Sequence, residues 1–289
     1  IVIFLVGITP FGIMGGYSVR NWFEALTRQS YDRLASVVEA KKEQIERLYS
    51  RHVSDLKAMT ETVLVLRQEA LKKITAARET SRGRVADFFD KVRQNLSLLA
   101  ASPDALQAFV KIRTYKDGYD DAKGEYLETI DVATEDYARL YDEISPFFKS
   151  YAAINGYDNI FIVDVELRNV MFSLKKTEDL GANLTKGPLR DSGLGRAVDQ
   201  AIKNSGEAFE DFTPYPAPGG RQAAFVATII KDVFNRTQAV LVFQLSPQPL
   251  QELVGRQEGM GRSGETFLIA RNDGKIVLRT KADSMFPTT

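Results

Sequence analysis

The side chains that could carry out chemistry in this sequence are of few kinds. Its 289 residues include no cysteine and a single histidine, His52. Thiolate chemistry, metal sites built from several imidazoles and any Ser-His-Asp triad centred away from His52 are therefore excluded. Carboxylates and lysines remain, and the carboxylate clusters are Asp120-Asp121, Glu210-Asp211 and Asp158 with Asp164. Such charged groups are mostly solvated.

Glycine motifs and overall charge add no catalytic or nucleic-acid signal. Gly193-Leu194-Gly195 lacks the preceding strand and the full glycine pattern of a phosphate-binding loop, and no nucleophile elbow is present. Basic and acidic residues each total 38, so no basic excess marks a nucleic-acid surface. We expect no catalytic residue, no metal site and no cofactor, and interpret the chain as a non-enzyme. An anchored hydrolase that uses carboxylates is the alternative, and a structural stalk is another.

The first nineteen residues predict a transmembrane helix. Residues 1–19 contain no charged side chain and precede Arg20 and Trp22. About 20 apolar residues are needed to cross the hydrocarbon core. Tyr17 and Trp22 suit the membrane interface, where amphipathic aromatic rings are favoured. A signal peptide and a buried core helix are the alternatives.

Residues 21 to 101 predict a long helical region. The segment contains no proline, and its apolar residues recur at three- and four-residue steps, as in helices that pack lengthwise. One stripe consists of Ile45, Leu48, His52, Leu56, Met59, Val63, Leu66 and Ala70. The stripe predicts a homodimer, and His52 within it is interpreted as a packing residue, with a proton switch as the alternative. A single helix of this length would measure about 120 Å, so a hairpin is also considered.

The helical region contains an internal repeat with an offset of forty residues. The first copy consists of Leu34, Ile45, Leu48, Tyr49, Leu56 and Met59, and the second of Ile74, Val85, Phe88, Phe89, Leu96 and Leu99. The match predicts equivalent packing roles for the two copies, and chance similarity between helical sequences is the alternative.

Two shorter helices are expected next. Ser102-Pro103 predicts the start of a helix over residues 104–111, because serine caps a first turn and proline is tolerated in it. A polar loop over residues 115–123 and a helix over residues 124–151 follow. Pro146 predicts a bend or a short interruption in that helix.

After Asn155-Gly156 the periodicity changes from helical to strand-like. Strands are expected over residues 158–165, 169–174, 208–213, 222–231 and 237–245, with a helix over residues 194–203. Short turns favour an antiparallel sheet with helices on one side, and an α+β fold in which the long helices pack on the sheet. A helix over residues 247–257 and a second hairpin, with strands over residues 265–270 and 275–279 around Asn272-Asp273-Gly274, complete the chain.

The order of these elements resembles the double Cache sensor domain of bacterial methyl-accepting chemotaxis proteins and sensor histidine kinases, which has a PAS-like sheet. The resemblance is carried by the stretches YDNIFIVD (157–164), KKTEDLGANL (175–184) with Gly187-Pro188, GEAFEDFTPY (206–215), AAFVATII (223–230), VLVFQL (240–245) and GRSGETFLIA (261–270). It implies a transmembrane helix over residues 1–19, a helical stalk over 20–75, a membrane-distal ligand-binding module over 76–258 and the beginning of a smaller membrane-proximal module over 259–289.

The resemblance also implies a ligand pocket in the distal module, between the sheet and its covering loops. Amino-acid-binding members of the family carry a Tyr-x-Asp after the third strand, whereas here Ala217 follows Tyr215 at that spacing. We therefore expect a different small-molecule ligand, of anionic character. Lys175 and Lys176 could meet its carboxylate. The remaining expected site residues are Phe161, Phe172, Asp211, Phe212, Tyr215 and Phe225. For the aromatic residues the alternative is the sheet core, and for the lysines it is a solvated loop.

The function implied is ligand sensing outside the cytoplasm by a chemoreceptor of the bacterial inner membrane. The sensor region is expected in the periplasm or outside the cell. Long helices would transmit the signal to cytoplasmic partners. The sensor region of a histidine kinase or nucleotide cyclase is the alternative.

Overall fold

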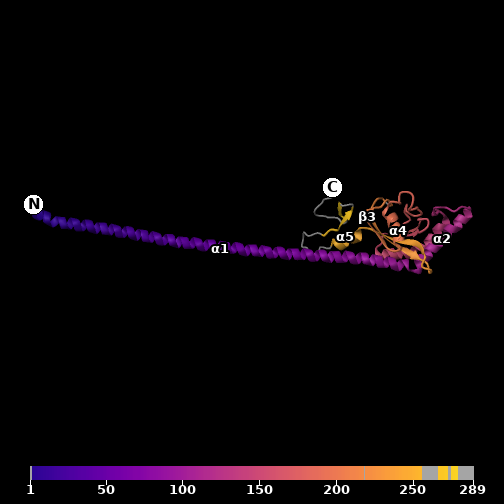
Figure 1. The fold of residues 1–289 in the computed structure, drawn as a ribbon, viewed down its shortest axis with the longest axis horizontal. Helices are drawn as coiled ribbons and strands as arrows, with labels where there is room; N and C mark the ends of the chain where they lie inside the picture. The colour runs from indigo at the N-terminus through magenta and orange to yellow at the C-terminus, as the bar shows by residue number, and fades with distance from the viewer. Residues whose placement is uncertain (1, 218, 256–265, 273–274, 279–289) are drawn as a thin grey trace. The chain divides into compact units, whose positions relative to one another are not determined.

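The computed structural model describes the chain except for residues 1, 218, 256–265, 273–274 and 279–289 (Figure 1). It divides into two compact units, Ile1–Lys72 and Lys73–Thr289. The helices are α1 (Val2–Ala100), α2 (Pro103–Lys123), α3 (Glu135–Asn155), α4 (Gly193–Asn204) and α5 (Gln248–Val254). The strands are β1 (Asn159–Asp164), β2 (Val170–Ser173), β3 (Ala208–Pro214), β4 (Gln222–Lys231), β5 (Thr237–Leu245), β6 (Ile269–Asn272) and β7 (Lys275–Leu278).

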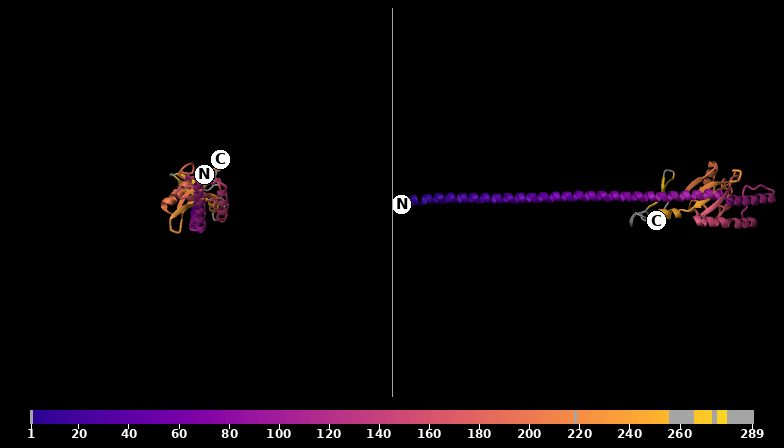
Figure 2. Two further views of the ribbon diagram at one scale, coloured as in Figure 1. Left: turned by 90° about the vertical axis from the view of Figure 1, so that its right-hand side faces the viewer. Right: turned by 90° about the horizontal axis from the view of Figure 1, so that it is seen from below.

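The long helical region is one helix and not a hairpin. Helix α1 runs without a break through 99 residues, as Figures 1 and 2 also show. The predicted transmembrane helix begins among residues 1–9, whose side chains lie outside the described part of the chain. Within the part that is described, no helix has the length and apolarity needed to cross a membrane.

Helices α2 and α3 differ from the prediction at their boundaries. The expected loop over residues 115–123 is helical, because Lys116 and Asp120 continue the buried side of α2 and Gly124 ends the helix with φ +68°. The expected helix start near Gly124 was also wrong. Helix α3 begins after Thr134, whose hydroxyl accepts a hydrogen bond from Tyr137 N at 3.1 Å. Helix α3 continues through Pro146, so of the two expected effects of this proline the interruption does not occur.

All five expected strands are present and form one antiparallel sheet in the order β2-β1-β5-β4-β3. This confirms the α+β fold class. The prediction that helices cover only one side of the sheet was wrong, because both faces are covered. One face packs against α1, α2 and α3 through residues such as Ile162 and Phe243, and the opposite face packs against α4 through residues such as Phe161 and Val242. The unbroken apolar runs of the central strands fit burial on both faces.

An ion-pair cluster joins α2 to the β1–β2 hairpin. Arg113 donates to the buried carboxylate of Asp164 and to Glu166, and it also pairs with Asp117. Burial lowers the pKa of Arg113, but the hydrogen bond to Glu166 and the charges of Asp164 and Asp117 outweigh it, so the pKa is raised overall. The guanidinium therefore stays charged and fixes the hairpin against α2.

The second hairpin is present as β6 and β7, which pair antiparallel from Ile269↔Leu278 to Asn272↔Lys275. Its turn residues Asp273-Gly274 and the start of the GRSGETFLIA stretch at 261–265 lie outside the described residues. Helix α5 ends at Val254, with Gly255 as its C-cap, and is therefore shorter than the helix expected to reach residue 257. The predicted membrane-proximal module over residues 259–289 is described only over residues 266–272 and 275–278.

Candidate functional site

The sheet face beneath α4 carries a buried polar group within an otherwise apolar core. The core on this side includes Phe161 and Phe225 from the strands, Leu194 and Val198 from α4, and Leu189 from the segment before it. Helix α4 begins at Ser192, whose hydroxyl accepts from Gly195 N at 3.2 Å. This arrangement places a loop and a short helix over one half of the sheet.

Asp179 lies at the centre of the polar group and is fully buried. Its Oδ1 accepts hydrogen bonds from Ser173 Oγ at 2.8 Å and from Thr177 Oγ1 at 2.9 Å. Its Oδ2 accepts from Tyr215 Oη at 3.2 Å. Asn159 Nδ2 in turn donates to Ser173 Oγ at 3.1 Å. We call Asp179, Ser173, Thr177 and Tyr215 the Asp179 cluster.

The Asp179 carboxylate is held by hydroxyl groups and not by a cation. Burial raises its pKa, and the hydrogen bonds from Ser173, Thr177 and Tyr215 oppose that rise only in part. Among the described residues, no lysine or arginine contributes to this shift. Burial and the neighbouring carboxylate likewise raise the pKa of Tyr215, so its hydroxyl remains a donor. The backbone N–H of Asp179 itself is a fourth donor to the carboxylate, which has about four acceptor positions.

A second buried polar atom lies where α4 meets β3. A Cβ at Gly193 would lie 2.9 Å from Phe225 Cδ2 and 3.3 Å from Thr213 Oγ1. The start of α4 therefore packs directly on these two side chains. Thr213 Oγ1 is buried and makes no hydrogen bond within the described residues, an arrangement that costs stability unless a further group satisfies it. The aromatic ring of Phe225 also contacts Tyr215, with ring centroids 4.9 Å apart.

Three of the expected site residues lie together beneath α4. Phe161 and Phe225 have ring centroids 6.4 Å apart, and Tyr215 packs against Phe225. All three are almost completely buried and belong to the core on this side of the sheet. Their rings pack against the protein's own side chains, including those of α4. A ligand at this place would therefore have to contact the ring edges or displace part of α4 and the segment before it.

Two further aromatic residues lie on the opposite face of the sheet. Phe172 packs against Tyr141 and Phe148 of α3, with ring centroids 5.4 Å and 5.0 Å apart. Phe212 belongs to the same core of α1, α2 and α3. The structure therefore does not bring these two residues together with Phe161.

The polar members of the expected site have partners of their own. Lys175 Nζ pairs with Asp158 Oδ1 at 2.7 Å. Lys176 Nζ lies 3.7 Å from the centre of the Tyr141 ring on α3. Asp211 Oδ1 accepts a hydrogen bond from the backbone N–H of Phe212 at 2.7 Å. These residues do not form one cluster with the Asp179 group, and their part in ligand binding stays a prediction.

Asp179, Ser173 and Thr177 are the residues that the sequence reasoning did not select. They lie within or beside the KKTEDLGANL stretch, and Gly181 follows Asp179 with φ +78°. An acidic residue two positions before a glycine turn, following a buried strand, was the available signal. Its burial depends on Tyr215, which is 36 residues away.

Several solved structures of sensor and ligand-binding domains are similar to this structure. The structure is similar to the Vibrio cholerae histidine kinase DctB sensor domain, with a TM-score of 0.45 and 10% identity over 68% of this chain and 61% of that one. It is similar to the ligand-binding domain of the Campylobacter jejuni chemoreceptor Tlp3 in complex with 4-methylisoleucine, with a TM-score of 0.42 and 16% identity over 65% of this chain and 63% of that one. The periplasmic domain of Vibrio cholerae LuxQ gives a TM-score of 0.41 and 12% identity over 75% and 82%.

These similar structures are sensor and ligand-binding domains of histidine kinases and chemoreceptors, and a periplasmic domain. The chain spans 61% and 63% of the DctB and Tlp3 structures. No protein-family model matches the chain, and no curated protein matches it. The similarity therefore concerns the fold, and ligand, partners and output are treated below as proposals.

Proposed function

We propose that this chain is the extracytoplasmic, non-catalytic ligand-sensing region of a bacterial membrane receptor. The ligand site is the Asp179 cluster and the adjoining corner of Thr213 and Phe225, beneath α4. The observation that carries this proposal is a fully buried carboxylate that no cation of the described residues neutralises. Burial of an unpaired carboxylate costs stability, and such cost is typical of functional sites.

The ligand that best fits this site is small and carries an ammonium or other cationic group. A cation at Asp179 Oδ2 would add the missing charge pair in a region of low dielectric constant, where such pairs are strong. A hydroxyl or amide donor from the same ligand could satisfy Thr213 Oγ1, which has no partner among the described residues. The anionic ligand expected from the sequence is the second candidate, but Lys175 and Lys176 already contact Asp158 and Tyr141.

Signal transmission would follow from the layers of the fold. A ligand beneath α4 changes the packing on one face of the sheet, and the other face packs on α1 and α3. The ligand can shift the equilibrium between two helix arrangements only by its differential affinity, typically about 1–3 kcal/mol. A chemoreceptor output is our first proposal, and a histidine kinase or cyclase is the second.

The proposal is tested by ligand binding to the whole chain. Thermal-shift screening and titration calorimetry would use a panel of L-amino acids, polyamines and dicarboxylates. We expect a cationic or zwitterionic compound to bind the wild type, and Asp179→Asn to weaken that binding about tenfold or more, which corresponds to the loss of a charge-assisted hydrogen bond. The matched control is Asp121→Asn, at an exposed position in α2.

Three results would decide against the proposal. Binding of no compound in the panel would remove its support, and equal binding by wild type and Asp179→Asn would exclude the Asp179 cluster as the site. Binding of dicarboxylates alone, weakened by Lys175→Gln or Lys176→Gln, would favour the anionic ligand at the lysines.

A further inference from the structure

The two adjacent carboxylates Asp120 and Asp121, near the end of α2, lie in different environments. Asp121 is exposed, whereas Asp120 is 4% exposed and forms an ion pair with Lys116, which is 1% exposed. Lys116 Nζ lies 2.5 Å from Asp120 Oδ2. Removing two charges from water costs stability unless their geometry and further hydrogen bonds compensate. The burial of this pair, which lies outside the Asp179 cluster, therefore requires an explanation of its own.

The hydrogen bonding of the Lys116–Asp120 pair is incomplete. Asp120 Oδ1 is buried and has no hydrogen-bond partner within the described residues. Within the same residues, Lys116 Nζ donates one hydrogen bond, to Asp120 Oδ2, although an ammonium group carries three N–H donors. Buried polar atoms without a partner are destabilising and are rare in native proteins. The pair can therefore take up a further donor at Asp120 Oδ1 and a further acceptor at Lys116 Nζ.

Tyr126, in the segment between α2 and α3, covers this pair. Its ring centre lies 4.4 Å from Lys116 Nζ, and the residue is 60% exposed. A cation–π contact at an exposed ring is weak, so moving the ring aside costs little. The segment itself is held by a separate contact, because Tyr119 Oη of α2 donates to Asp131 Oδ2 at 2.7 Å. Movement of the Tyr126 side chain would thus open the pair without unfolding the segment.

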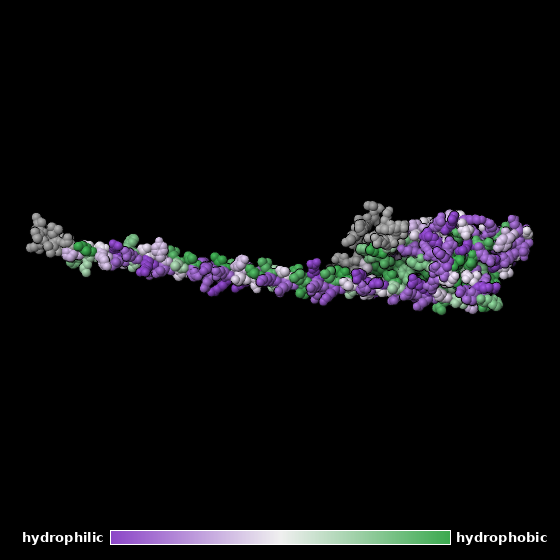
Figure 3. All heavy atoms as spheres, in the orientation of Figure 1, coloured by the Kyte–Doolittle hydropathy of each residue, from purple (hydrophilic) through white to green (hydrophobic). Residues whose placement is uncertain are grey.

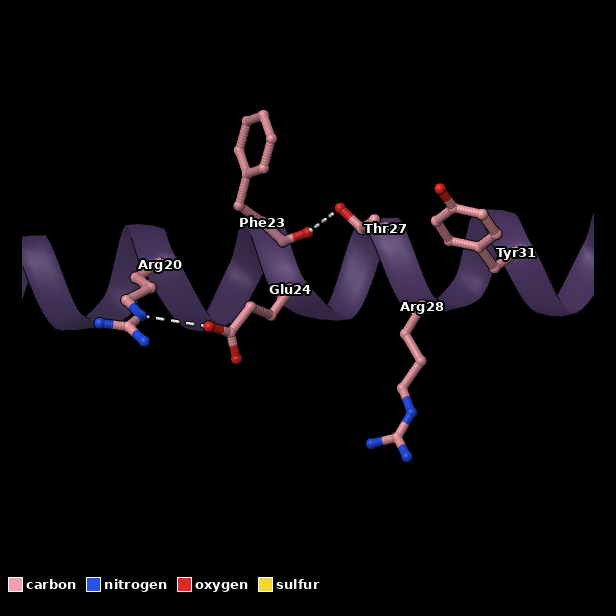
Figure 4. A pocket seen from close by; sticks show the side chains of 6 residues that line it. All are labelled: Arg20, Phe23, Glu24, Thr27, Arg28 and Tyr31. Carbon is pink, nitrogen blue, oxygen red and sulfur yellow. Dashed lines mark hydrogen bonds and ion pairs between the residues drawn. The ribbon is translucent and has the colours of Figure 1, made fainter.

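Two hollows on α1 differ from this place in the fold, because each is lined by residues of that one helix alone. In the hollow between Arg20 and Tyr31, Phe23 and Arg28 extend to opposite sides of the helix (Figure 4). A small ligand needs a concave site that surrounds most of its surface. The end of α2 comes closer to this requirement, because the helix and the segment after it both contribute side chains.

The ligand that fits the Lys116–Asp120 pair is neutral and carries adjacent hydroxyl groups. A hydroxyl group both donates and accepts hydrogen bonds, so one hydroxyl can donate to Asp120 Oδ1 while its neighbour accepts from Lys116 Nζ. A cationic ligand would be repelled by Lys116, and an anionic ligand by Asp120. The face of the Tyr126 ring carries partial negative charge and can pack against C–H groups. Polar residues also predominate on the visible face of the second unit at its α2 end (Figure 3).

We propose that Lys116, Asp120 and Tyr126 form a ligand site for a sugar or another polyol with vicinal hydroxyl groups. The ligand makes one hydrogen bond to each member of the ion pair, and the Tyr126 ring closes over it. This site differs from the Asp179 cluster in its position and in the chemistry of its ligand. It does not depend on the proposed function.

Titration calorimetry on the whole chain tests this site with D-glucose, D-galactose, D-ribose and myo-inositol. Cyclohexanol is the control compound, because it lacks vicinal hydroxyl groups. We expect at least one of the four to bind, and Asp120→Asn to weaken that binding about tenfold, because a hydrogen bond to a charged group is lost. Tyr126→Ala should weaken it roughly fivefold and Tyr126→Phe should not, because the ring and not the hydroxyl makes the contact. The matched control Asp121→Asn should bind as the wild type does.

Four results would overturn the proposal. They are the absence of binding by all four compounds, and binding that Asp120→Asn and Tyr126→Ala leave unchanged. Cyclohexanol binding as tightly as myo-inositol would indicate apolar contact alone. Binding weakened by Asp179→Asn and not by Asp120→Asn would assign the compound to the Asp179 cluster. Because Tyr126 is exposed, its variants are expected to fold, so they test the site even if Asp120→Asn does not fold.

Discussion

The Asp179 cluster makes a specific prediction about stability. Asp179→Leu leaves the hydroxyls of Ser173, Thr177 and Tyr215 without their acceptor. A buried donor without a partner costs about 1–3 kcal/mol. Since the Ser173 and Tyr215 side chains are buried, we expect Asp179→Leu to lower the free energy of unfolding by roughly 2–6 kcal/mol.

Asp179→Asn should behave differently, because the amide oxygen still accepts from Ser173 and Thr177. We expect its unfolding free energy near pH 7 to equal that of the wild type within about 1 kcal/mol, or to exceed it. Burial raises the pKa of Asp179, so the folded chain holds the proton to a higher pH than the unfolded chain does. Wild-type stability therefore falls as the pH rises from the ordinary carboxyl pKa through the raised one, and Asp179→Asn lacks this component.

Urea unfolding of the three proteins at several pH values would measure both effects. The advantage of Asp179→Asn over the wild type should increase with pH across that window. If Asp179→Asn is destabilised as strongly as Asp179→Leu, the negative charge itself stabilises the fold and the reasoning about an unneutralised carboxylate is wrong.

Three further predictions can be checked by the same unfolding measurement. Gly195→Ala should lower the free energy of unfolding by about 1–3 kcal/mol, since its Cβ would lie 2.4 Å from Arg190 O. The control Gly118→Ala, in an open part of α2, should raise the free energy of unfolding by about 0.5–1 kcal/mol. Equal effects of the two substitutions would contradict the packing at α4. Arg113→Ala should cost about 1–3 kcal/mol, while Arg139→Ala, which breaks only an exposed pair, should leave stability unchanged. Tyr137→Phe should cost about 1 kcal/mol, because its hydroxyl donates to a buried carbonyl at 2.8 Å, and no loss would mean that another group replaces this donor.

The strands were predictable because each is a short apolar run between turn residues. Residues 222–231 and 237–245 were predicted with the bounds that β4 and β5 have. The helix boundaries failed where polar residues are buried. Lys116 and Asp120 were predicted to lie in a loop because they are charged. In the structure they form a buried ion pair with each other, and no local sequence pattern indicates that burial. Thr134, followed by two acidic residues, was a capping signal that could have located the start of α3.

The candidate site was only partly accessible to sequence reasoning. The strand aromatics were predicted as site residues, with the sheet core as the alternative. They lie in the cores on both faces of the sheet, because alternation along each strand sends neighbouring side chains to opposite faces. Phe161 and Phe172 are thus separated by the sheet itself. The buried state of Asp179 follows from contacts with Tyr215 that form only in the folded chain.

Strand β2 gives this arrangement a mechanical consequence. It is an edge strand of four residues, and two consecutive side chains connect it to different layers. Ser173 bonds to Asp179, while Phe172 stacks on Tyr141 of α3. A displacement of β2 on the Asp179 side would therefore also move Phe172 relative to Tyr141 on the opposite face, because the two side chains are attached to consecutive backbone residues.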